Sequence, residues 1–87
     1  MTLQFPNQSR SFDEARNAVR FVGHDGMFEV PFFVEVAALT KPSRGNWSET
    51  ECLTAFDAAR GSILDVARRA YSHRRGTSYI LTVADFL

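Results

Sequence analysis

Alternating apolar residues around a glycine-containing turn constrain the fold of this chain more than any other feature. Residues 18–22 and 27–34 are rich in β-forming side chains, and they flank the turn-forming stretch 23–26. Asp25-Gly26 is a preferred pair for a two-residue type I′ turn, because both central positions need a positive φ. The pattern therefore predicts an antiparallel β-hairpin with Asp25-Gly26 at its tip.

This turn also predicts the register of the hairpin. Phe21 then lies opposite Val30, and cross-strand partners share one face of the sheet. The apolar face collects five residues in this register: Val19, Phe21, Phe28, Val30 and Phe32. A loop of odd length would place Phe21 opposite Glu29 and scatter the set, so the even register is favoured.

Four shorter segments complete the order of elements. Residues 3–5 predict a first strand, residues 8–17 a polar loop, residues 36–39 a short helix and residues 77–83 a last strand. Pro31 cannot donate a hydrogen bond to a strand ladder, so its strand is expected at an edge of the sheet or at a bulge.

A capped, amphipathic helix is expected to begin at residue 49. Ser48 and Glu51 form a capping box, in which each side chain accepts a hydrogen bond from the backbone amide of the other residue. Gly76, after a run of basic residues, ends the helix. Apolar side chains at spacings of three and four form one continuous stripe on it: Cys52, Phe56, Ala59, Ile63, Val66 and Ala70.

The length of this helix leaves two arrangements open. A helix over residues 49–75 would be about 40 Å long at 1.5 Å per residue, whereas a domain of 87 residues is roughly 30 Å across. The helix is therefore expected either to break, most naturally at Gly61, or to overhang the domain. An overhang would need a second surface to cover its stripe, which would favour a dimer.

These elements together predict an α+β fold. The expected architecture is a two-layer sandwich in the order β-β-β-α-α-β, with an antiparallel sheet and the helices on one of its faces. The 87 residues, 45% of them apolar, suit a single domain over residues 1–87. No apolar run reaches the roughly 20 residues of a membrane span, and the N-terminus lacks the regions of a signal peptide. With Cys52 as the one cysteine of the chain, a soluble cytoplasmic protein is expected.

Short motifs spread over nearly the whole chain resemble a family of small bacterial proteins. In order, they are Phe5, Ser11-Phe12-Asp13, Ala18-Val19-Arg20-Phe21, Asp25-Gly26, Ala38-Leu39 and Tyr79-Ile80-Leu81. The family is the domain of unknown function 1488. The resemblance implies a small α+β two-layer sandwich in a bacterial cytoplasm. It implies no activity, because the family has no assigned catalytic or binding residues to carry over.

The charge of the chain is zero overall but unevenly distributed. Residues 60–76 hold five arginines against Asp65 alone, a net of +4, and the rest of the chain has a net of −4. A basic helix end of this kind can bind phosphates, and the candidate residues are Arg68, Arg69, Arg74 and Arg75. The alternative is that Asp65 pairs with Arg68 or Arg69 while the terminal arginines complement the helix dipole.

Two aromatic residues are candidates for a protein interface. Trp47 immediately precedes the capped helix, and Phe33 lies on the mixed face of the hairpin. Aromatic residues are enriched in interfaces, and a chain with a basic end and an acidic body can steer its own association. The alternative is that either ring belongs to the core.

The patterns that carry catalysis or bind metals are not found in the sequence. His24 shares a turn with Asp25 and is expected in solvent, and His73 has only Ser72 beside it. Cys52 falls on the apolar stripe, where a core position is favoured over a reactive thiol. With no glycine-rich phosphate loop and no metal-ligand spacing, neither a cofactor nor an enzymatic activity is expected.

The preferred interpretation is a non-enzymatic protein-interaction or regulatory module that associates with itself or with another protein. The alternative is an accessory nucleic-acid-binding protein that uses the basic helix end at residues 60–76. The first needs an exposed apolar patch, whereas the second needs its arginines on one face and an affinity that falls steeply with salt.

Overall fold

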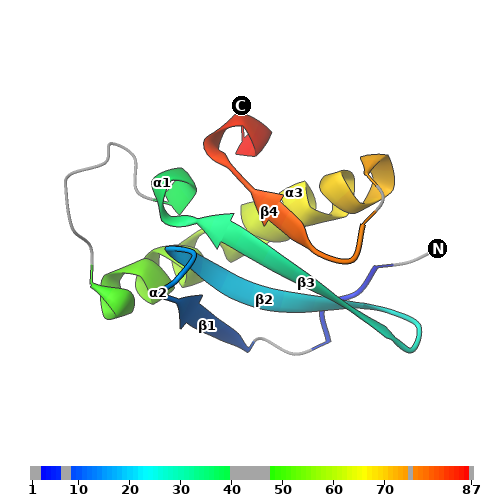
Figure 1. Cartoon of the computed structure of the whole chain (residues 1–87), viewed down its shortest axis with the longest axis horizontal. Helices are drawn as coiled ribbons and strands as arrows, with labels where there is room; N and C mark the ends of the chain where they lie inside the picture. The colour runs from blue at the N-terminus through cyan, green and yellow to red at the C-terminus, as the bar shows by residue number, and fades with distance from the viewer. Residues whose placement is uncertain (1–2, 7–8, 40–47, 75, 87) are drawn as a thin grey trace.

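A four-stranded sheet backed by helices makes up the fold (Figure 1). The structure is a computed structural model, and it describes residues 3–6, 9–39, 48–74 and 76–86. Its elements in chain order are β1 (Arg10–Asp13), β2 (Ala18–Asp25), β3 (Phe28–Glu35), α1 (Val36–Leu39), α2 (Glu49–Ala58), α3 (Arg60–His73), β4 (Tyr79–Leu81) and the 3₁₀ helix η1 (Val83–Phe86). The α+β class expected from the sequence is confirmed.

The sheet is mixed rather than antiparallel, which corrects one expectation. Its strand order is β1-β2-β3-β4, and the first three strands are antiparallel to their neighbours. Strand β4 instead runs parallel to β3. The reason lies in the connection, because α2 and α3 carry the chain back along the sheet before β4 begins, and a crossover of this kind joins parallel strands.

The hairpin between β2 and β3 forms, but the predicted register was wrong by two residues. Phe21 lies opposite Phe32, and the turn is made by Gly26 and Met27 while Asp25 still pairs with Phe28. Among the described residues of this turn only Gly26 has a positive φ, at 63°, as in a type II′ turn with glycine at its first central position. A shift by an even number keeps every side chain on its face, so the apolar face survives.

The N-terminal part of the chain differs from expectation in two ways. The strand predicted at residues 3–5 is a single bridge between Gln4 and His24, and the strand β1 lies inside the predicted loop. An ion pair of 2.7 Å between Arg10 and Asp57 of α2 holds β1 in place. The hydrogen bond from Arg10 lowers the pKa of the Asp57 carboxyl.

Pro31 was expected on an edge strand or at a bulge, but its strand β3 lies inside the sheet, between β2 and β4. It faces Val22 in the ladder between β2 and β3. His24 directs its amide and carbonyl toward Gln4, so by alternation Val22 also directs its own away from β3. The nitrogen of Pro31 therefore faces the opposite edge, at a point beyond the residues that β4 pairs, Phe32–Val34.

The helical stretch begins at the predicted capping box but breaks at a different residue from the one expected. Both hydrogen bonds of the capping box form, at 3.1 Å from the Glu51 amide to Ser48 and at 2.8 Å from the Ser48 amide to Glu51. The break falls at Ala59, which separates α2 from α3, and not at Gly61. Ala59 has a φ of −108°, and it is the one member of the predicted stripe that is exposed.

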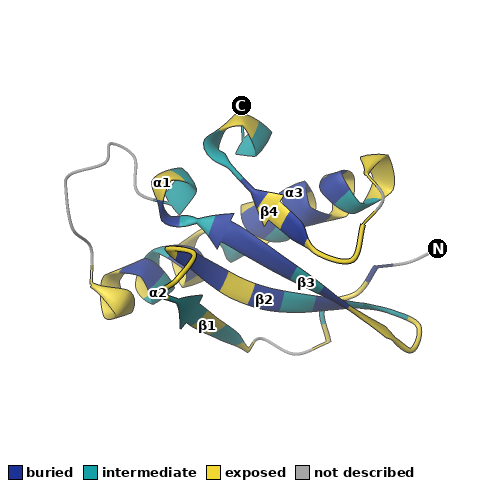
Figure 2. Ribbon diagram, viewed as in Figure 1, coloured by how far each residue is buried: buried dark blue, intermediate teal, exposed yellow. Residues whose placement is uncertain are grey.

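The core lies between the sheet and the pair α2 and α3, whose buried faces meet β2 and β3 (Figure 2). Stacked and tilted aromatic rings fill much of it, with centroids of Phe21 and Phe56 5.1 Å apart and those of Phe32 and Tyr79 5.2 Å apart. The face of the sheet that carries Arg20, Val22 and Phe33 points away from α2 and α3. That second face, hereafter the open face, and the hairpin end are the surfaces left for function.

Candidate functional site

A cleft lies beside the C-terminal half of α3, between that helix and the N-terminal segment. Its volume is about 610 Å³, and its wall includes Leu3, Arg68, Tyr71, Arg74 and Tyr79. The helical spacing of Arg68 and Tyr71 places both side chains on one side of α3. We call this hollow the α3 cleft.

Hydrogen bonds from two tyrosines fix the wall of the α3 cleft. The Tyr71 hydroxyl donates to the carboxylate of Asp25, and this bond, together with burial, raises the pKa of Tyr71. The Tyr79 hydroxyl donates to the carbonyl of Arg74 at 2.9 Å. The two rings meet edge to face with centroids 5.8 Å apart. The cleft is thus tied to the end of the hairpin on one side and to the end of α3 on the other.

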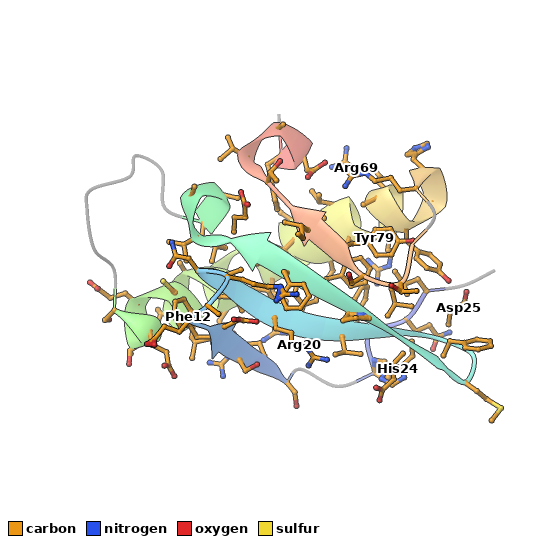
Figure 3. All side chains as sticks on the ribbon, in the orientation of Figure 1. Phe12, Arg20, His24, Asp25, Arg69 and Tyr79 are labelled. Atoms are coloured by element: carbon orange, nitrogen blue, oxygen red, sulfur yellow. The ribbon has the colours of Figure 1, made fainter. Side chains whose placement is uncertain are left out.

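The arginines of the basic helix end do not form one surface. Arg68 forms an ion pair with Asp65 at 3.4 Å, which is one of the two pairings expected for Asp65. Its guanidinium lies 5.2 Å from the centre of the Phe5 ring. Arg69 points away from Asp25 and lines a different hollow, of about 330 Å³, beside η1 (Figure 3). Arg68 and Arg74 line the α3 cleft, and Arg74 also lines the second hollow together with Arg69. Arg69 does not line the α3 cleft, and Arg75 lies outside the described residues.

Arg74 is held at the edge of the cleft by Asp85 of η1, with which it forms an ion pair. Burial opposes ionisation of Asp85, but hydrogen bonds from the Thr82 amide and from Arg74 outweigh it and hold the pKa of this carboxyl below its usual range. The carboxylate is charged at neutral pH, so it balances part of the positive charge that Arg74 brings to the cleft.

The end of the hairpin projects from the domain with apolar side chains in solvent. Met27 is 97% exposed and Phe28 is 76% exposed, the largest values among the described large apolar residues. We define the hairpin tip as residues 26–28. Figure 2 shows it as an exposed end beyond the buried part of β2 and β3.

Three contacts support the strands just behind the hairpin tip. Gln4 and His24 exchange both backbone hydrogen bonds, at 2.8 and 2.7 Å, and Asp25 accepts the bond from Tyr71 of α3. At Gly23 an added Cβ would lie 2.9 Å from the side chains of Leu3 and Phe5, so the N-terminal segment packs directly onto this backbone. The tip is therefore a supported projection from the domain.

The two aromatic interface candidates lie elsewhere. Phe33 is on the open face, 8% exposed, with the Arg16 guanidinium 4.6 Å from its ring centre. Its ring is covered by Arg16, and the exposed apolar side chain nearby is Ile80, at 48%. Trp47 lies outside the described residues.

The cysteine and the histidines that the sequence analysis considered for catalysis or metal binding lie in three different elements. Cys52 is fully buried, and burial, followed by the charge of Glu51, raises the pKa of its thiol. His24 is partly buried in β2, and His73 is exposed at the end of α3. Over residues 3–6, 9–39, 48–74 and 76–86, no three metal-ligating side chains come together.

The sequence analysis missed Met27 and Phe28 as candidate functional residues. It predicted that Phe28 lies on the apolar face of the hairpin. The ladder agrees, because Phe28 pairs with Asp25 in the same alternation that pairs Phe32 with Phe21. What alternation cannot reveal is that the face extends past the end of α3, so no helix covers it. The available signal was a large apolar pair beside a glycine turn, where polar residues are usual.

This combination defines a class of small α+β domain: a mixed four-stranded sheet with helices packed against it, and an exposed apolar hairpin end next to a cleft. The chain belongs to the family described as "Protein of unknown function (DUF1488)", which matches residues 3–83. This confirms the resemblance seen in the sequence. Neither the curated proteins nor the solved structures include a match to the chain. None of the helices formed by the described residues has the length and apolar character needed to cross a membrane.

Proposed function

We propose that this chain is a small, non-enzymatic protein-interaction module of the cytoplasm and that its hairpin tip is the docking element. The observation that carries the proposal is the exposure of Met27 and Phe28, at 97% and 76%, on a hairpin that α3 and the N-terminal segment hold from behind. Exposed apolar side chains on a supported projection are suited to enter a pocket of a partner protein.

The energetics favour such a role for the tip. Burying a Met or Phe side chain that is otherwise in water contributes roughly 1.5–3 kcal/mol, and Met and aromatic residues are enriched in the cores of interfaces. Binding also costs less when the docking element is ordered beforehand. The backbone pairing of Gln4 with His24 and the bond from Tyr71 to Asp25 supply that order.

The proposed architecture is a two-layer domain in which α2 and α3 back the sheet and leave the tip free. Core side chains such as Phe56 and Phe32 are fully buried, while Phe28 on the same sheet face is not. The tip can therefore be changed without opening the core, and binding can be separated from folding by experiment.

The test is affinity capture with the tagged full chain, followed by identification of the bound proteins and a binding measurement with the purified partner. The variant carries Met27→Ser and Phe28→Ser, and Ile80→Ser is the matched control because it removes another exposed apolar side chain. We expect the wild type and the control to bind the same partner and the tip variant to bind it at least about tenfold more weakly. Equal affinity of the tip variant, with an unchanged circular dichroism spectrum, would show that the tip is not the docking element.

The alternative proposal is nucleic-acid binding at the basic helix end, supported by the placement of Arg68 and Arg74 beside two tyrosines in the α3 cleft. It has weaker support, because Arg68 and Arg74 each pair with an aspartate and Arg69 lies on another side of α3. Binding to single strands also relies on a continuous basic groove. In the same capture experiment, nuclease-sensitive material that is lost at moderate salt would favour this alternative.

A further inference from the structure

We propose that the partner of the hairpin tip is a second copy of this chain, and that the tip of each copy enters the α3 cleft of the other. This inference rests on the proposed function, because it identifies the partner of the same docking element. It differs from it in requiring the cleft, which the proposed function does not use.

The size and lining of the α3 cleft suit the tip. Its volume of about 610 Å³ lies within the roughly 300–1,000 Å³ of pockets that enclose a ligand, which leaves room for a Met and a Phe side chain. Leu3, Tyr71 and Tyr79 supply an apolar and aromatic wall. Phenyl rings and thioether sulfurs both make favourable contacts with aromatic rings.

The charges of the two surfaces are complementary. Glu29 directly follows the tip, whereas Arg68 and Arg74 line the cleft. Asp25, directly before the tip, already accepts a hydrogen bond from Tyr71 of its own chain. The pair between Arg68 and Asp65 is long, at 3.4 Å, and its side chains are 48% and 74% exposed, so it contributes little stability. Arg68 can therefore exchange Asp65 for an acidic group of a second copy at little cost in ion pairing, and such complementarity steers encounter.

The positions of tip and cleft allow a closed dimer. Both lie at the same end of the molecule, joined by the bond between Tyr71 and Asp25. A twofold axis near this end would bring each tip to the other cleft at once, which is an isologous and self-limiting contact. A formal charge of zero leaves no net repulsion between copies.

A stable dimer needs a defined part of the surface of each copy. A stable interface buries about 800 Å² on each partner, which is about one seventh of the 5717 Å² surface of the chain. In the reciprocal dimer the buried area is divided between two tip-to-cleft contacts. Each partner contributes its projecting tip and its concave cleft to it.

The test uses sedimentation velocity of the full chain over a wide concentration range. Phe28→Ser alters the tip and Arg68→Glu alters the cleft, while Ile80→Ser and Arg69→Glu are their matched controls on the open face and on the η1 side of α3. We expect a monomer–dimer equilibrium that either test variant weakens at least about tenfold, equivalent to about 1.4 kcal/mol, and that neither control changes by more than about twofold.

Mixing the two variants separates this arrangement from other dimers. A mixed dimer of Phe28→Ser with Arg68→Glu keeps one intact tip-to-cleft contact, because the intact tip of the second copy meets the intact cleft of the first. In a dimer of either variant alone both contacts are broken, whereas in the mixed dimer both substitutions fall on the same, already broken contact. We therefore expect the mixture to associate more strongly than either variant by itself, whereas a tip-to-tip or helix-to-helix dimer would show no recovery.

Three results would overturn the inference: a wild type that stays monomeric at every concentration, a dimer that neither variant weakens, or a mixture without recovery. The proposed function fails separately. A monomeric wild type that binds a different purified protein through Met27 and Phe28 would overturn the second copy as partner and leave the docking role of the tip intact.

Discussion

Two phenylalanines from apolar faces, one on a helix and one on a strand, differ in how far they are buried. Phe56 of α2 is fully buried, with its ring centre 5.1 Å from that of Phe21, while Phe28 is 76% exposed. Helical periodicity was enough to predict that Phe56 lies in the core. Strand alternation predicted the face of Phe28 but not its exposure, because exposure depends on where α3 ends relative to the sheet.

This contrast gives a prediction for the free energy of unfolding. Phe56→Ala removes a large side chain from a closed core and should lower the free energy of unfolding by about 3–5 kcal/mol. Phe28→Ala is the matched control and should change it by less than about 0.5 kcal/mol. Urea unfolding followed by circular dichroism measures both, and a large loss for Phe28→Ala would mean that its ring is part of the core.

At the scale of elements, local chemistry was predictable and tertiary pairing was not. The capping box depends on Ser48 and Glu51, three residues apart, and both of its hydrogen bonds are found. Strand β1 pairs with β2 and contacts α2 through Arg10 and Asp57, which are 47 residues apart. The parallel pairing of β4 likewise depends on the path of α2 and α3, which no local pattern encodes.

The hairpin shows the same division within one element. Its existence and its apolar face follow from alternation, but its register depends on which residue takes the positive φ. Gly26 takes it at the first position of the turn, and Asp25 remains in the ladder opposite Phe28. The Asp25-Gly26 dipeptide therefore predicted a two-residue turn correctly, but the turn consists of Gly26 and Met27.

The cap of α2 provides the prediction at this scale. Ser48→Ala removes the acceptor for the Glu51 amide, and loss of such a cap costs about 1 kcal/mol of stability. Ser62→Ala, in the exposed first turn of α3, is the control and should be neutral within about 0.5 kcal/mol. If thermal unfolding shows equal effects for the two variants, the capping box contributes no stability of its own.

At the scale of the whole molecule, most of the described arginines of the basic segment 60–76 form ion pairs within the chain. Arg60, Arg68 and Arg74 each bind an aspartate in the described part of the chain. Two of the four arginines that the sequence singled out, Arg68 and Arg74, line the α3 cleft. The sequence did not predict the hairpin tip or the bond between Tyr71 and Asp25, because residues 25 and 71 meet only when the sheet packs against α3.

The most direct test of the central claim, that the hairpin tip and the α3 cleft form the interaction surface between two copies of the chain, is a dilution series of ¹H–¹⁵N spectra of the full chain. We predict that the amide signals of Met27 and Phe28 shift with concentration together with those of Arg68 and Tyr71. Signals near Ile80 on the open face should stay constant. A spectrum that does not change with concentration, or changes confined to the open face, would contradict the claim.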